Sequence, residues 1–132
     1  VLDVKKRMFS HAYDVYINNA KKNTHLCVFE TSRKLEKLGA GELVVNSIDL
    51  DGSMSGSDLS LAADLKKVVV VPSPILGGAG SLQDIEALLN RCGLVGAAAG
   101  SFFVYKGPYK AVLLNYPSLS QKDKLINGVF GT

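Results

Sequence analysis

The sequence predicts an α/β fold in which strand–helix units build a parallel sheet. The candidate strands are rich in Val, Ile and Ala, as expected for strands that are buried on both faces. Amphipathic segments of helical length separate them, and consecutive strands begin roughly 25 to 42 residues apart. This spacing is typical either of a doubly wound sheet or of a closed (β/α)8 barrel.

The first unit begins with a short strand over residues 1–4, where the carboxylate of Asp3 interrupts an apolar run. Residues 13–17 alternate strictly between polar and apolar side chains, which predicts a half-exposed strand. Together with residues 8–9, this segment is expected to form a small hairpin over the end of the first strand. A helix should follow over residues 26–38, because its large apolar side chains share one face and glycines come directly after it.

The second unit has a strand over residues 43–48, a glycine-punctuated loop over residues 49–58 and a helix over residues 59–67. The third unit begins with a strand over residues 68–75. Two prolines in that strand each remove a backbone donor that a central strand would use, so they argue against an ideal central strand.

The glycine-rich loop 77–80 ends the third strand and leads into a helix over residues 82–92, which Ser81 is expected to cap. A glycine closes this helix, and the fourth strand is predicted over residues 94–104. The last segment, residues 107–126, is expected to be partly helical and broken by prolines.

Length and composition fit one domain spanning residues 1–132. Hydrophobic residues make up 47% of the chain, which supplies a core, and the mean hydropathy is +0.17. The formal net charge of +3 is mild. A nucleic-acid binder usually shows a broader basic face with interleaved aromatic residues, so nucleic acid is not expected as a partner.

Cysteine usage and hydropathy predict a cytoplasmic protein. Cys27 and Cys92 lie far apart with no ligand spacing around them, which favours reduced structural thiols and no metal site. No apolar run reaches membrane-spanning length, and the first residues do not form a signal peptide. The buried-strand pattern at residue 1 suggests that a further segment precedes it.

Functional residues of a parallel α/β fold lie where strands end and loops begin. Asp3 is one candidate, because a carboxylate within an apolar strand is costly to bury unless it has a partner or a task. Its structural alternative is a pairing with Lys5 or with another strand-end residue. At the second strand end the candidates are Asn46, Asp49, Asp51 and Gly52, although Asp-Gly is also a common turn.

The third and fourth strand ends carry the strongest signals. Gly77 and Gly78 precede a helix, so their backbone N–H groups suit a phosphate, although a plain tight turn uses the same residues. Gly100 and Ser101 follow a run of alanines, where small residues let an anion approach the backbone. Two consecutive glycine-rich strand ends predict one shared phosphate site.

These motifs resemble the cyclase subunit of imidazole glycerol phosphate synthase and its close paralogues. The order and spacing of the matching segments follow that family across nearly the whole chain. The segments are 2–6, 21–24, 38–43, 46–52, 55–58, 77–80 and 98–103. The resemblance implies half of a (β/α)8 barrel with four parallel βα units, equivalent to strands five to eight of the family. The first four strands, which carry a second aspartate and a loop lysine, lie outside this sequence.

The resemblance implies an ammonia-dependent cyclase (a lyase) of histidine biosynthesis. Such an enzyme closes the imidazole ring of imidazole glycerol phosphate on a ribonucleotide with a phosphate at each end, and a glutaminase partner supplies the ammonia. Asp3 matches the fifth-strand aspartate that does general acid/base work. Polar and glycine positions match the substrate and phosphate contacts, with no cofactor implied: Asn46, Asp51, Gly52, Gly77, Gly78, Gly100 and Ser101.

Three departures leave alternatives open. Leu76 stands where the family usually has a small, often polar residue, and Asn19-Ala20 replaces a small residue and glycine. The tail 105–117 is closer to the paralogues associated with amidation of surface-polysaccharide sugars. A third alternative is an inactive phosphate-binding half-barrel. Because an isolated half leaves open sheet edges, we expect it to form a homo-oligomer or to pair with the other half of the barrel.

Overall fold

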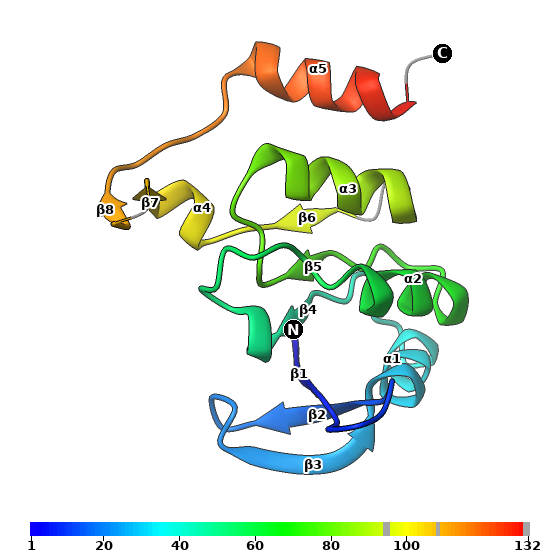
Figure 1. Cartoon of the computed structure of the whole chain (residues 1–132). Coiled ribbons are helices and arrows are strands. Elements are labelled where there is room, and N and C mark those ends of the chain that lie inside the picture. Colours follow the sequence, from blue (N-terminus) through cyan, green and yellow to red (C-terminus); the bar gives the residue numbers. More distant parts are fainter. Residues whose placement is uncertain (94–95, 108, 131–132) are drawn as a thin grey trace.

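The computed structural model describes residues 1–93, 96–107 and 109–130 and contains a six-stranded sheet with the order β3-β2-β1-β4-β5-β6 (Figure 1). Four of these strands are parallel neighbours. They are β1 (Leu2–Lys6), β4 (Val45–Ser47), β5 (Ile75–Leu76) and β6 (Ala97–Ala98). Each is followed by helical structure, so the expectation of four parallel βα units, a partial (β/α)8 barrel, is confirmed.

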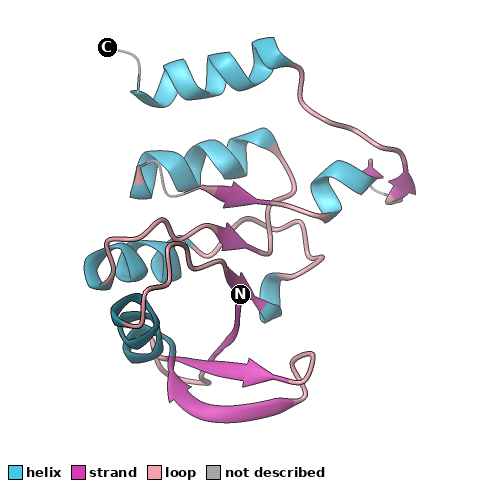
Figure 2. Cartoon of the chain, turned by 180° about the vertical axis from the view of Figure 1, so that it is seen from behind, coloured by secondary structure: helices cyan, strands magenta, loops and turns pink. Residues whose placement is uncertain are grey.

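Helices cover one face of the parallel strands. They are α1 (Val28–Lys37), α2 (Leu59–Val68) and α3 (Leu82–Cys92). Apolar side chains from these helices and from the strands form one core, whose fully buried members include Val28, Val45, Leu61, Ile75 and Leu88. Figure 2 shows the helices gathered beside the strands. The opposite face of the parallel strands therefore carries the side chains that alternate with these core residues.

An antiparallel extension precedes α1. Strand β2 (Tyr13–Ile17) has the predicted bounds and pairs with β1, whereas β3 (Lys22–Cys27) pairs with β2. The sequence had predicted a small hairpin here but no strand in 22–27, whose side chains do not alternate. Pairing with β2 makes this segment a strand, and the hydroxyl of Thr24 fixes it by donating to the carbonyl of Val15 at 2.6 Å.

Two predicted strands are much shorter than expected. Val68 completes the last turn of α2, and only Ile75–Leu76 form β5. The amides of Val70 and Val71 donate to a carboxylate oxygen of Glu36, at 2.7 and 2.9 Å, instead of to a neighbouring strand. The fourth strand, predicted over 94–104, is limited to Ala97–Ala98 in its described part, and residues 94–95 lie outside the described residues.

The chain after β6 is built from short elements and one longer helix. A turn of helix, α4 (Ser101–Val104), leads into a two-stranded hairpin of β7 (Tyr105–Lys106) and β8 (Ala111–Val112). Helix α5 (Leu119–Phe130) then lies beside α3 (Figure 1). The expected partly helical segment is therefore confirmed, although Pro108 lies outside the described residues. No helix in the described part of the chain is long and apolar enough to cross a membrane.

Candidate functional site

One row of residues crosses the four parallel strands on the face opposite the helices. The Cα partners are Asp3 with Asn46, Asn46 with Leu76, and Leu76 with Ala98. Their neighbours Leu2, Val45 and Ile75 are buried against the helices, so alternation turns this row to the other side of the sheet. The row lies one residue before the loops at the carboxyl ends of β5 and β6, which is the usual place for function in this architecture.

Asp3 and Asn46 form a hydrogen-bonded pair at the start of this row. The side-chain amide of Asn46 donates to a carboxylate oxygen of Asp3 at 3.0 Å. Of the structural partners expected for Asp3, a residue of the neighbouring strand is therefore present, whereas Lys5 is not its partner. The Lys5 ammonium instead lies 3.4 Å from a carboxylate oxygen of Asp49. Asn46 thus orients Asp3 without neutralising its charge.

The other side-chain atom of Asn46 has no partner. Its Oδ1 is buried and accepts no hydrogen bond among the described residues. A buried acceptor without a donor is costly, and such atoms usually await water or a ligand. This oxygen lies on the side of Gly77, since a Cβ placed on that glycine would be 3.5 Å from it.

The glycines of loop 77–80 allow a close approach between two loops. A Cβ on Gly77 would lie 2.7 Å from the carbonyl oxygen of Ser47, and one on Gly78 would lie 2.0 Å from that of Gly56. Both glycines have positive φ, +100° and +91°, which side chains rarely adopt. The amide of Gly56 donates to the carbonyl of Gly78 at 2.8 Å. No other residue type fits Gly78 in this arrangement.

Three loops meet at a small pocket at the carboxyl ends of the strands. Its lining residues come from the loops after β4, β5 and β6: Asp51, Gly52, Met54, Leu76, Gly77, Gly78, Ala79, Ala99, Gly100 and Ser101. A Cβ on Gly52 would lie 3.9 Å from the hydroxyl oxygen of Ser101, which shows how near the first and third loops are. Six of the nine sequence candidates therefore line one pocket. Asn46 adjoins it, Asp3 is hydrogen-bonded to Asn46, and Asp49 instead pairs with Lys5.

Backbone N–H groups of this pocket are available to an anion. The amides of Gly77, Gly78, Gly100 and Ser101 donate to no acceptor among the described residues. The amide of Gly80 differs, because it donates to Asp84, which forms a reciprocal cap of α3 with Ser81. The predicted cap of α3 is thus confirmed. It occupies the amide nearest to the helix and leaves those deeper in the loop free.

The free volume of the pocket is about 10 Å³, the space of one water molecule. A phosphate group needs more room. The loop 51–58 covers the pocket and contains Met54 in the left-handed region, with φ of 56°. In this conformation the pocket is too small for a phosphate group, so the loops that line it would have to separate to admit one.

Comparison with known proteins gives the family. The sequence model of the family described as histidine biosynthesis protein matches residues 1–110. The chain belongs to this family. A Vibrio vulnificus relative, provisionally named imidazole glycerol phosphate synthase subunit hisF3, is 49% identical over 95% of this chain and 48% of its own length.

Two further relatives carry related names. A Leptospira interrogans protein, provisionally named imidazole glycerol phosphate synthase subunit HisF, is 44% identical over 94% of the chain and 49% of its own length. The imidazole glycerol phosphate synthase subunit HisF of Clostridium botulinum (strain Okra) is 37% identical over 80% of the chain and 42% of its own length. The chain spans about half the length of the curated relatives it matches. The family resemblance inferred from the sequence is therefore confirmed.

Two residues at or near the pocket of this member of the histidine biosynthesis protein family were not predicted from the sequence. Met54 and Lys110 reach the pocket region through tertiary contacts, and the ammonium group of Lys110 donates to the carbonyl of Gly52 at 3.1 Å. Only the lysine's position after a Gly-Pro turn could have pointed to a hairpin that folds back. Among the described residues, no group of three His, Cys, Asp or Glu side chains could hold a metal ion.

A second polar cluster holds the antiparallel extension against α2. The hydroxyl of Tyr13 donates to a carboxylate oxygen of Asp58 at 2.8 Å, and the other oxygen of Asp58 accepts from the amide of Leu61 at 3.0 Å. Burial, and then the hydrogen bond to Asp58, raise the pKa of Tyr13. Tyr13 therefore stays a neutral donor at the start of α2, where it fixes one end of the loop that covers the pocket.

Proposed function

We propose that residues 1–132 form one domain, the carboxyl-terminal half of a cyclase barrel that acts in the cytoplasm. The complete barrel would use ammonia from a glutaminase partner to form imidazole glycerol phosphate from a ribonucleotide with two phosphates, in histidine biosynthesis. The single observation that carries this proposal is the register of the strands. It aligns the Asp3–Asn46 pair with a pocket of free backbone amides.

The roles of the residues follow from their chemistry. Ring closure needs a group that accepts a proton from the attacking nitrogen and returns one to the departing oxygen, and a carboxylate such as Asp3 does both. Asn46 orients that carboxylate and offers its unpartnered oxygen to a substrate N–H or O–H group. Gly77, Gly78, Gly100 and Ser101 would bind a terminal phosphate through their amides.

The test is an activity measurement on a complete barrel. The chain is coexpressed with the complementary half of the Vibrio vulnificus relative, and ring closure is measured with ammonia as nitrogen source. Asp3→Asn keeps the hydrogen bond from Asn46 possible but removes the proton-transfer group, so kcat should fall at least about 100-fold while KM changes little. Asp49→Asn is the matched control, because this exposed carboxylate pairs with Lys5 outside the row.

Retained activity of Asp3→Asn, or an equal loss in Asp49→Asn, would contradict the proposed role of Asp3.

One observation favours a second candidate function. Leu76 places an apolar side chain in the row and in the pocket lining, where it offers no hydrogen bond to a substrate. The same barrel is therefore also assayed for a role in the amidation of surface-polysaccharide sugars. Turnover there, without imidazole formation, would favour the paralogue, and inactivity in both assays would favour a phosphate-binding half-barrel without catalysis.

A further inference from the structure

The hairpin of β7 and β8 brings one cation back to the rim of the pocket. Lys110 lies at the turn of this hairpin, where its amide donates to the carbonyl of Gly107 at 3.1 Å. Its backbone is in the left-handed region, with φ of 48°, and its side chain extends to the carbonyl of Gly52 at 3.1 Å. Fifty-eight positions separate Lys110 from Gly52 in the sequence, so only the fold places them together.

The ammonium group of Lys110 can donate further hydrogen bonds. A lysine has three N–H donors, and the contact with Gly52 uses one of them. No ion pair among the described residues includes Lys110. The positive charge at the rim is therefore not neutralised by a protein carboxylate within ion-pair distance.

The pocket itself needs a positive charge if it is to hold an anion. Asp51 is the acidic residue of the lining, and a negative charge there disfavours a phosphate that approaches the amides of Gly77 and Gly78. A carboxylate instead accepts hydrogen bonds from hydroxyl groups. The lining thus combines an acidic residue with backbone donors for an anion, and the ammonium group of Lys110 at Gly52 adds a positive charge at its rim.

We propose that Lys110 binds the phosphate group of a sugar phosphate, and that this phosphate enters the pocket between Gly52, Gly78 and Ser101. This inference rests on the proposed function, because it assigns a specificity residue to the same phosphate pocket. It adds a cation from outside the βα units to a site that strand-end glycines alone would otherwise form. Charge-assisted hydrogen bonds to phosphate are stronger than those from neutral amides, so Lys110 should contribute measurably to affinity.

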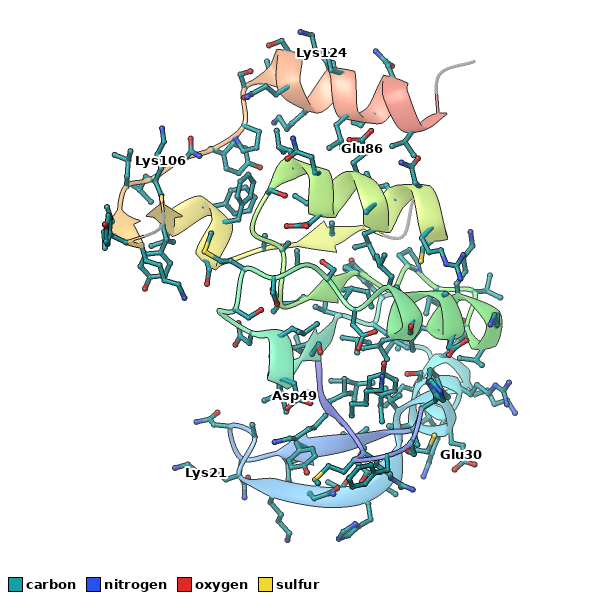
Figure 3. All side chains as sticks on the ribbon, viewed as in Figure 1. Lys21, Glu30, Asp49, Glu86, Lys106 and Lys124 are labelled. Carbon is teal, nitrogen blue, oxygen red and sulfur yellow. The ribbon has the colours of Figure 1, made fainter. Side chains whose placement is uncertain are left out.

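The experiment measures binding of inorganic phosphate to the full chain by isothermal titration calorimetry. Lys110→Gln retains a donor for the carbonyl of Gly52 but removes the charge, and Lys110→Arg retains both. Lys106→Gln is the matched control, because Lys106 is an exposed lysine of the same hairpin in β7 (Figure 3). Circular dichroism of each variant establishes that the fold is retained.

We expect Lys110→Gln to weaken phosphate binding about fivefold, since the charge acts at a partly solvated rim, and Lys110→Arg to restore it. Lys106→Gln should bind as the unchanged chain does. Equal affinity of Lys110→Gln and the unchanged chain would overturn the role of Lys110 and leave the phosphate pocket standing. Absence of phosphate binding by the unchanged chain would overturn both the pocket and the role of Lys110.

Discussion

Gly78 determines how closely the loops over the pocket pack. Its carbonyl accepts from the amide of Gly56, and its missing side chain leaves room for the carbonyl of that same residue. Gly80 makes a similar approach to Met54, where a Cβ would lie 2.6 Å from the carbonyl oxygen. At the scale of single residues, the pocket therefore depends on backbone atoms that only glycine allows to meet.

Gly78→Ala should destabilise the chain by about 2 kcal/mol or more, because alanine adds both a clash and strain at positive φ. Gly41→Ala is the matched control, since a Cβ on Gly41 would meet nothing within 4 Å. Urea unfolding gives the free energy of unfolding of each variant. Equal stabilities for the two variants would show that the loops do not pack as described.

At the scale of elements, an ion pair between the exposed Arg7 and the buried Asp14 fastens the extension of β2 and β3 to the loop after β1. Asp14 is 4% exposed, accepts from the guanidinium of Arg7 at 2.8 Å and accepts from the amide of Asn23 at 3.0 Å. The hydrogen bond from Arg7, and then that from Asn23, lower the pKa of Asp14, although burial acts in the opposite direction. The ionised form of Asp14 thus stabilises the folded extension.

The sign of the pH dependence follows from this lowered pKa. The stability that Asp14 contributes is fully present above its ordinary pKa of 3.8 and is lost as pH falls below that value through the folded-state pKa. The unchanged chain should therefore lose free energy of unfolding relative to Asp14→Asn as pH drops below about 4. Urea unfolding at a series of pH values measures the difference, with Asp123→Asn in α5 as an exposed control. A difference that stays constant with pH would contradict the assignment.

Elements with local signals could be predicted from the sequence. Helix α3 has the predicted bounds, because its cap residue Ser81 and its closing Gly93 directly flank it in the sequence. The third strand was predicted too long, because a run of valines predicts a strand even where the run pairs with no neighbouring strand. Glu36, over thirty residues earlier, takes the amides of Val70 and Val71, and no local pattern reveals such a contact.

The candidate site divides in the same way. Asp3 could be found because it is a carboxylate within an apolar strand, and Gly77 because it directly follows one. The register of the parallel strands then aligns the two strands with each other through β4. Lys110 could not be found, since its approach depends on a hairpin that folds back over the loop of Gly52. Sequence patterns thus locate the residues within the βα units, and the fold adds those from outside them.

At the scale of the whole molecule, apolar surface is exposed on two sides. Leu26 and Leu38 are exposed beside α1, and Val112, Leu114 and Tyr116 are exposed after the β7 strand. Strands β3 and β6 are the edges of the six-stranded sheet. Exposed apolar surface of this extent and open sheet edges favour association.

We therefore expect the chain to form a homo-oligomer alone, or to pair with the other half of the barrel when that half is present. Sedimentation velocity at micromolar concentration should show a species larger than 14.1 kDa. Addition of the complementary half of the Vibrio vulnificus relative should replace this species by a mixed one. A stable, well-folded monomer under these conditions would contradict the expectation.

We expect an anion to bind at the glycine-rich strand ends, next to the Asp3–Asn46 pair. Amide chemical shifts of the isotope-labelled chain, followed during titration with inorganic phosphate, test it most directly. The largest shifts are expected at Gly77, Gly78, Gly100 and Ser101, a smaller one at the side-chain amide of Asn46, and none at Gly39 or Gly41. Shifts confined to other parts of the chain, or no shifts at the four pocket amides, would contradict it.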